Sequence, residues 1–305
     1  MLALAVLFTV GPAPARPGAR AASYWQQQVA YLITASLDEP SGVLTGRELI
    51  TYVNRSPDTL REFYVHDYLN AFRPGSRWAM ADSAEGRERF QHLKDPDYAF
   101  ERIGAATIMG RSLTPEYPYA PDSTIARWTL ARPLAPGDSL TAEIAWQARP
   151  STLPRRQGRE GRRFDFAQWY PKVVVYDRYG WEDHPLYPAG EFYGEFATYD
   201  VTLELPEDQV IGATGVPVEG DPGWERAKAD PNLRIDYQRD WYGRKGDSLT
   251  ARQPVRLTAR CGAVGRGRKC VRFYAEQVHH FAFSLNPDYV YEEGRYGDLV
   301  VRVLY

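Results

Sequence analysis

Short runs in which apolar and polar residues alternate recur along this chain of 305 residues. In one of them, Val29, Tyr31, Ile33, Ala35 and Leu37 fall on one face of an extended strand, because successive side chains of a strand point to opposite faces. We expect further strands at 43–54, 63–69, 124–130, 140–146, 172–176, 199–205, 209–213, 255–260, 271–275 and 299–304.

So many short strands predict an antiparallel all-β domain. The chain also contains 23 Pro and 25 Gly, which disfavour long helices and favour turns between strands. Only two stretches suit a helix. We expect one short helix at 276–284 and consider a second, charged surface helix at 84–94.

The charge balance argues against one class of partner. The chain has 37 Lys and Arg against 39 Asp and Glu, a formal net charge of −2, so there is no electrostatic case for a nucleic-acid binder. Hydrophobic residues make up 44% and charged residues 25%, which is typical of a globular protein. No apolar run reaches the roughly 18 residues that a membrane span needs.

The N-terminus has the pattern of a secretory signal. An apolar run at 2–10 is followed by prolines and then by Ala19-Arg20-Ala21, which fits an A-x-A cleavage site. We therefore expect a signal peptide at 1–22, one domain at 23–305, and an exported protein that is periplasmic or extracellular. The other interpretation is a Pro/Ala-rich tail without structure.

Two segments of the expected domain are irregular. The segment 149–163 is rich in Pro and Gly and carries six arginines, so it is expected to be a loop, either solvated or able to grip an anion. The segment 222–247 is polar and interrupted by Gly and Pro, which indicates an insertion loop.

The two cysteines, Cys261 and Cys270, flank a Gly-rich turn. Export to an oxidising compartment would allow a disulfide between them, and two free thiols are the alternative. Two cysteines are too few for a Cys₄ zinc site.

Motifs of catalysis are sparse. The five histidines form no H-E-x-x-H, and neither a G-x-S-x-G nor a C-x-x-C is present. Glu191 and Glu195 are the most suggestive carboxylate pair, in an aromatic-rich stretch that would suit glycoside hydrolysis. We therefore expect neither catalytic residues nor metal ligands in this chain, and the glycosidase is a minor alternative.

Aromatic residues are most concentrated in the segment 164–205. Such residues bury large areas and present polar tips, so they serve a core as readily as a binding surface. A stand-alone β-sandwich module that binds glycan or peptide through Trp169, Tyr170 and Trp181 is consequently the main alternative function.

Several blocks resemble the N-terminal domain of aminopeptidase N-type zinc metallopeptidases, in a divergent bacterial branch. They occur in the family's order between Tyr24 and Tyr305, and they are Tyr24-Trp-Gln-Gln, Gly46-Arg-Glu-Leu-Ile, Asn54-Arg-Ser-Pro-Asp-Thr-Leu, Pro133-Leu-Ala-Pro-Gly-Asp-Ser-Leu, Gln168-Trp-Tyr-Pro, Phe196-Ala-Thr-Tyr-Asp-Val-Thr-Leu-Glu-Leu-Pro, Gly212-Ala-Thr-Gly, Val278-His-His-Phe-Ala-Phe-Ser and Pro287-Asp-Tyr-Val.

The resemblance implies a saddle-shaped β domain that precedes a thermolysin-like catalytic domain. Zinc and its H-E-x-x-H ligands would belong to that C-terminal domain, which would be this chain's partner, and the substrate would be a peptide. The chain alone would hold no cofactor and be inactive. The resemblance also makes Gln168 the best match for the residue that contacts the substrate's α-amino group, and we expect 168–170 on an apolar face covered by the catalytic domain.

Overall fold

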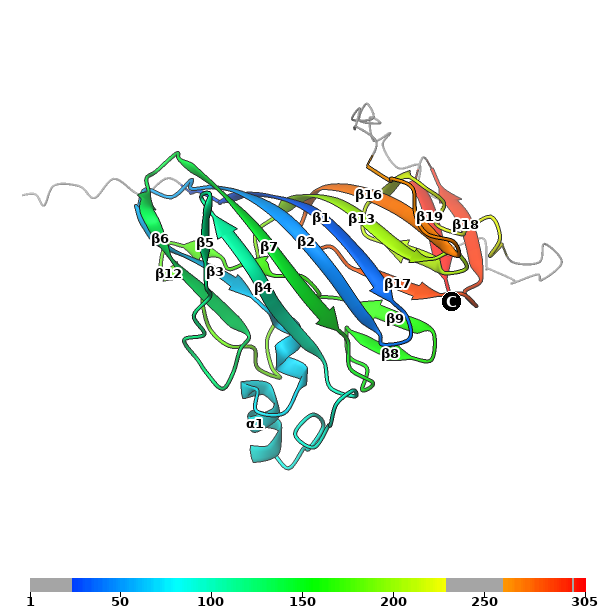
Figure 1. The fold of residues 1–305 in the computed structure, drawn as a ribbon, viewed down its shortest axis with the longest axis horizontal. Helices are drawn as coiled ribbons and strands as arrows, with labels where there is room; N and C mark the ends of the chain where they lie inside the picture. The colour runs from blue at the N-terminus through cyan, green and yellow to red at the C-terminus, as the bar shows by residue number, and fades with distance from the viewer. Residues whose placement is uncertain (1–23, 229–259, 298) are drawn as a thin grey trace, which may run out of the picture.

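The computed structural model describes residues 24–228, 260–297 and 299–305, and strands dominate it (Figure 1). The strands of the largest sheet are β1 (Gln28–Asp38), β2 (Val43–Val53), β4 (Phe100–Ile108), β5 (Arg111–Leu113), β7 (Ser139–Arg149), β13 (Ala197–Pro206), β15 (Val216–Glu219) and β16 (Arg268–Val278). This sheet has 8 strands in the order β15-β16-β13-β1-β2-β7-β4-β5.

Smaller sheets pack against this one. Two of them are built from the strands β3 (Leu60–His66), β6 (Ile125–Leu134), β8 (Gly158–Glu160), β9 (Arg163–Phe166), β10 (Lys172–Val173), β14 (Val210–Ala213) and β17 (Phe283–Asn286). Their orders are β10-β3-β6 and β14-β17-β9-β8. Two hairpins complete the strands of the described chain. One pairs β11 (Tyr176–Asp177) with β12 (Gly180–Trp181), and the other pairs β18 (Tyr291–Tyr296) with β19 (Leu299–Leu304).

The prediction of an all-β fold with a large sheet and little helix is confirmed. One feature of the pairing differs from the expected antiparallel arrangement. β1 and β13 run parallel, with Val29 opposite Ala197, so the large sheet is mixed. A chain segment of more than 150 residues separates the two strands, which is why local turn signals did not reveal their direction.

The helix expected at 276–284 is wrong. β16 continues to Val278, and β17 begins at Phe283. Near the end of β16, Gln277 has φ 56°, a left-handed conformation that interrupts a helix, and beyond the strand Thr214 donates its N–H to Ala282 O at 2.9 Å. The His-His-Phe-Ala-Phe run therefore turns the chain from one sheet to the next.

The helix of the structure lies earlier, at α1 (Arg77–Ala84), after a 3₁₀ helix η1 (Tyr68–Phe72). Ser76 caps α1, since its Oγ accepts from Ala79 N at 3.0 Å. The stretch 84–94 mostly forms turns beyond the end of α1, so the second expected helix is also misplaced. The buried Asp82 carboxylate, near the end of α1, accepts hydrogen bonds from Arg87 and Arg89 and so anchors this turn region.

The segment 149–163 is less irregular than expected, because it contains β8 and leads into β9. Five of its six arginines have side-chain partners within the domain. The Arg149 side chain is buried and pairs with Asp95 at 2.5 Å, while Arg162 contacts the carboxylate of Asp208. These contacts make the basic segment part of the framework.

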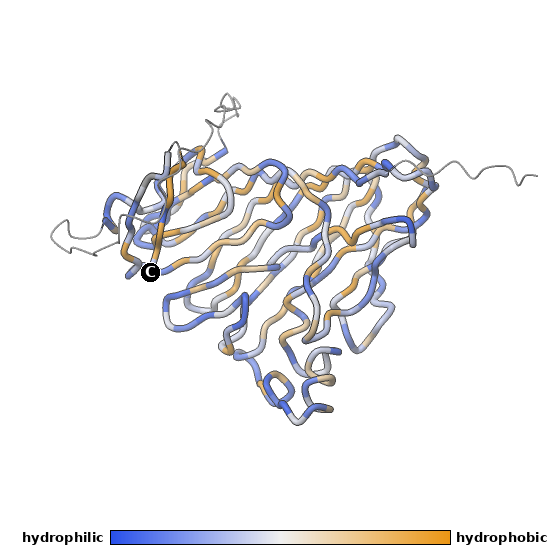
Figure 2. The backbone as a smooth tube through the Cα atoms, turned by 180° about the vertical axis from the view of Figure 1, so that it is seen from behind, coloured by the Kyte–Doolittle hydropathy of each residue, from blue (hydrophilic) through white to orange (hydrophobic). Residues whose placement is uncertain are grey.

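Hydrophobic segments follow the strands, and hydrophilic ones gather in the loops around α1 (Figure 2). One core cluster contains residues from all the larger sheets, among them Tyr31, Trp146, Trp169, Tyr199 and Phe283. The expected signal peptide 1–22, most of the insertion 222–247 and the strand at 255–260 lie outside the described residues, apart from 222–228 and Arg260. Within the described chain, no helix is long and apolar enough to cross a membrane.

Candidate functional site

The Gln168-Trp169-Tyr170 segment lies inside the domain. Gln168 is 5% exposed, and its backbone N–H donates to His280 Nε2 at 2.7 Å. The Trp169 indole N–H donates to Phe281 O at 2.9 Å, and the Tyr170 hydroxyl donates to the Tyr199 hydroxyl at 2.9 Å. The side chains of this segment therefore connect the turn after β16 to β13.

This burial contradicts the expectation that 168–170 lies on an exposed apolar face. Trp169 and Tyr170 are both 0% exposed. The same burial argues against the alternative in which Trp169, Tyr170 and Trp181 bind glycan or peptide. Trp181 is also partly buried, and its ring stacks on Tyr52. Large apolar side chains are instead exposed elsewhere, for example at Tyr193 and Val301.

The carboxylates of Glu191 and Glu195 are not a pair. Glu191 is exposed and forms an ion pair with Arg156 at 2.7 Å. Glu195 is 7% exposed, and its Oε1 accepts from Gln27 N at 3.3 Å. Because the two acids have different partners and environments, the structure does not support the glycosidase interpretation.

The contact of Glu195 with Gln27 follows from the parallel pairing of β1 and β13. With Val29 opposite Ala197, the residues that precede the two strands run side by side. Glu195 is thereby placed beside the Tyr24–Gln26 segment, and together they line a pocket. No local sequence pattern links residues 24–27 with 193–195, so sequence reasoning missed this site.

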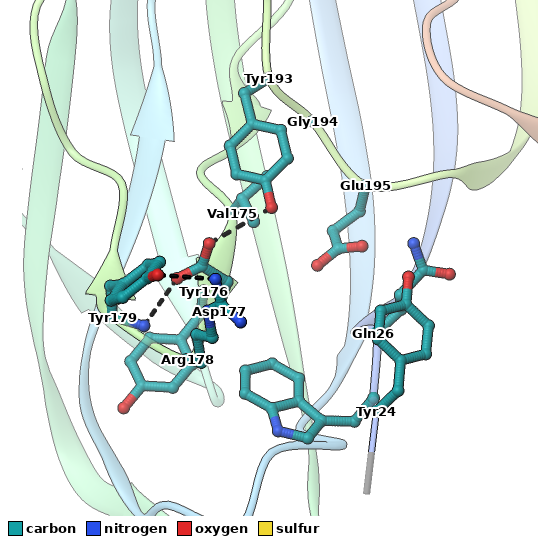
Figure 3. A pocket seen from close by; sticks show the side chains of 11 residues that line it. Tyr24, Gln26, Val175, Tyr176, Asp177, Arg178, Tyr179, Tyr193, Gly194 and Glu195 are labelled. Carbon is teal, nitrogen blue, oxygen red and sulfur yellow. Dashed lines mark hydrogen bonds between the residues drawn. The ribbon is translucent and has the colours of Figure 1, made fainter. Parts of the chain in front are cut away.

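The pocket has a volume of about 460 Å³. Figure 3 shows Glu195 directed into the space bounded by Tyr24, Asp177 and Tyr193. The walls are formed by the N-terminal segment, the β11–β12 hairpin and the segment before β13; they comprise Tyr24, Trp25, Gln26, Val175, Tyr176, Asp177, Arg178, Tyr179, Tyr193, Gly194 and Glu195.

Two ionisable groups near this pocket have perturbed acidities. Burial raises the pKa of the Glu195 carboxyl to about 7, and the Gln27 N–H and Lys172 partly oppose that rise. Burial lowers the pKa of the Lys172 ammonium to about 7, and Glu195 partly opposes that fall. Opposed shifts of this kind are common where buried groups perform chemistry or binding.

The Lys172 side chain is enclosed by its neighbours. Its Nζ donates to His279 O at 2.6 Å. A Cβ atom at Gly194 would overlap this Nζ, so the absence of a side chain at Gly194 lets the Lys172 ammonium lie against the segment before β13. Lys172 is therefore buried and does not line the pocket itself.

The described residues do not fit a zinc site. Within them, no group of three or more His, Cys, Asp or Glu side chains is arranged to hold a metal ion. Three of the five histidines are engaged otherwise: His280 accepts from Gln168 N, His66 stacks on Tyr68, and His92 pairs with Glu88.

Cys261 and Cys270 form a disulfide with a Cα–Cα distance of 5.7 Å. Cys270 lies in β16, while Cys261 lies in the irregular segment before it. The N–H groups of Arg260 and Cys261 both donate to the Glu219 carboxylate, so this segment is attached to β15 as well.

A scan against protein-family models and a search of curated proteins each return no match. Among solved structures, the chain is similar to an M1 zinc metallopeptidase from Deinococcus radiodurans, at 15% identity and a TM-score of 0.46 over 91% of this chain and 46% of that chain. A mutant M1 zinc metallopeptidase from the same organism, bound to a Tyr-Ser-Ala substrate, gives 14% identity, a TM-score of 0.46 and the same two coverages. The chain thus spans about half the length of these structures.

Proposed function

We propose that this chain is the N-terminal β domain of an aminopeptidase N-type zinc metallopeptidase-like protein, which flanks the peptide substrate. One observation carries the proposal: two of the blocks that resemble the family, 168–171 and the block that begins at Phe196, lie side by side. Their aromatic side chains meet in the core, with Tyr170 in edge-on contact with Tyr199 at 5.8 Å between ring centroids.

Peptide hydrolysis would belong to a C-terminal catalytic domain that carries H-E-x-x-H. Two of the blocks that resemble the family, at Gly46 and at Val278, also belong to strands of the same core.

The test compares two proteins from the native coding region: the 305-residue chain and the longest natural reading frame that contains it. We expect the longer protein to carry H-E-x-x-H, to bind one zinc ion and to hydrolyse a Leu- or Ala-linked chromogenic amide. The 305-residue chain should do neither. A longest reading frame without H-E-x-x-H, or chelator-sensitive turnover by the 305-residue chain, would refute the proposal.

A contact of Gln168 with the substrate's α-amino group is the finer part of the proposal. Its Oε1 is buried without a hydrogen-bond partner in the described structure, and a carboxamide oxygen accepts from an ammonium group. In the longest reading frame, Gln168→Leu should raise KM for a substrate with a free amine about tenfold, and Gln168→Glu should not. A loss of stability with unchanged KM would instead assign Gln168 a structural role.

We also propose that the protein is exported, to the periplasm or beyond the cell. The Cys261–Cys270 disulfide supports this localisation, because disulfides persist mainly in oxidising compartments. N-terminal sequencing of protein from the native host should begin near residue 23. An intact Met1 on protein in the cytoplasmic fraction would contradict export.

A further inference from the structure

The pocket at the start of β1 and β13 is made of preformed aromatic walls. The Trp25 ring stacks on Tyr176 with a centroid distance of 6.0 Å and an interplanar angle of 25°. Tyr176 is held in turn, since its hydroxyl donates to Asp58 at 3.0 Å and its ring meets Trp181 edge-on at 5.2 Å. A rigid aromatic face of this kind offers a negative quadrupole to a cation.

The opposite side of the pocket is also held in place. The Tyr193 hydroxyl donates to Asp177 at 3.3 Å, and the Tyr179 N–H donates to the same carboxylate at 2.8 Å (Figure 3). Asp177 therefore has two donors from the protein and positions Tyr193, a ring that is half exposed. Its charge adds to the negative potential of the pocket.

Glu195 differs from Asp177 because the described residues provide it with only one weak donor, the Gln27 N–H at 3.3 Å. No cation of the described chain lies within ion-pair distance of its carboxylate: the Lys172 Nζ donates to His279 O instead. Arg178 lies on the rim, where its guanidinium stacks on Tyr179 and donates to the Tyr179 hydroxyl at 2.6 Å. Glu195 is thus a buried carboxyl that faces the pocket with no ion pair in the described chain, and the Lys172 ammonium acts on it only from beyond ion-pair distance.

We propose that this pocket binds the ammonium or guanidinium group of a ligand, held against the rings of Trp25 and Tyr193 and neutralised by Glu195. The volume of about 460 Å³ suits a small amine or one basic side chain of a peptide. This site is independent of the proposed peptidase role, since it lies entirely within residues 24–195 and its test needs only this chain.

The test is calorimetric or saturation-transfer NMR titration of the 305-residue chain at pH 8, where most of Glu195 is ionised, at low ionic strength. The probes are n-butylammonium, n-butylguanidinium and the neutral n-butanol. We expect the two cations to bind with a Kd of about 1 mM and n-butanol to bind at least about tenfold more weakly. No binding by the cations, or equal binding of n-butanol, would overturn the proposal.

Matched variants locate the binding. Glu195→Gln should weaken n-butylammonium binding about tenfold or more, and the Gln side-chain oxygen still accepts from Gln27 N. Glu191→Gln, four residues earlier and exposed, should leave the affinity unchanged. A second matched pair uses two tyrosines of similar exposure. Tyr193→Leu should weaken n-butylammonium binding, and Tyr187→Leu should leave it unchanged. Equal effects within either pair would refute the assignment.

Two further probes identify the source of the cation. Alanyl-alaninamide offers only a free α-amine, and Nα-acetyl-lysinamide offers only a side-chain ammonium. Preferential binding of the first assigns the pocket to a peptide N-terminus, and preferential binding of the second assigns it to a basic side chain. If Glu195→Gln abolishes the binding of neither probe, the pocket does not bind peptides, and the proposal is wrong for peptide ligands.

Discussion

The most unusual side chains of this domain are three carboxyls in its interior, Glu48, Asp67 and Glu101, each no more than 1% exposed. Burial raises the pKa of all three, and their mutual repulsion adds to the rise for Glu48 and Glu101. An acid with a raised folded-state pKa contributes stability that is complete below its unfolded-state pKa. That contribution is lost as the pH rises, because ionisation in the unfolded state is then favoured.

We therefore predict that Glu48→Gln changes stability in a pH-dependent way. The free energy of unfolding of the variant, relative to that of the wild type, should rise by about 1–3 kcal/mol from pH 5 to pH 8. The reason is that the amide of the variant cannot ionise, whereas the buried carboxyl of the wild type opposes ionisation. Urea denaturation at both pH values measures the gain. Glu143→Gln, at an exposed position of β7, is the control, and an equal gain there would contradict the prediction.

Gly46 in β2 is required by its cross-strand neighbour. It lies opposite Trp146, and a Cβ there would be 2.3 Å from the Trp146 ring. We predict that Gly46→Ala destabilises the domain by about 1–3 kcal/mol, because the buried indole has no space to withdraw. Gly104→Ala, whose nearest contact would be 3.4 Å, should cost less than half as much in the same urea titration. Equal losses would exclude overpacking as the cause.

Among the elements, β16 depends on a covalent link at its beginning. The Cys261–Cys270 disulfide closes a short loop with a sequence separation of 9. By the loop-entropy relation, we predict that Cys261→Ser with Cys270→Ser lowers the unfolding free energy by about 2–3 kcal/mol. Denaturant titration of the variant and of the unreduced wild type measures this. Protein exported from its native host should show no alkylatable thiol before reduction, and two such thiols would contradict the bond.

The elements also show why one local pattern misled. Residues 276–284 have few helix breakers, and their length suits a short helix. In the structure Ala275 is buried in β16 and Phe283 in β17, two strands of different sheets, and Phe281 is buried in the connection between them, so the chain must turn there. The gain from burying two Phe rings exceeds a helix preference of a few tenths of a kcal/mol per residue.

For the whole molecule, Trp169 is the side chain on which the packing of the sheets converges. Its ring contacts Trp146, Tyr170 and Phe283 at centroid distances of 5.0–5.5 Å. We predict that Trp169→Ala lowers the unfolding free energy by about 3–5 kcal/mol. Tyr187→Ala, at an exposed ring, should cost less than about 1 kcal/mol. A loss of similar size in both variants would show that Trp169 does not organise the core.

Much of the strand framework was predictable from local alternation, because burying one face of a strand requires a period of two. The faces of β1, β2 and β7 follow that period. The candidate site was less accessible: Glu195 was noticed, but as a partner of Glu191, which the structure pairs with Arg156. Proximity in sequence was a poor guide, since neighbouring residues on an irregular segment can face different surroundings.

The order of apolar and polar residues was sufficient for the all-β class, since it depends only on which side chains avoid water. The pocket required more. It exists because β1 and β13 pair in parallel and bring Gln27 to Glu195 across 168 positions of the chain. The pKa of Glu195 and the burial of Trp169 and Tyr170 depend on the same packing, because desolvation is a property of the surrounding atoms and not of the residue.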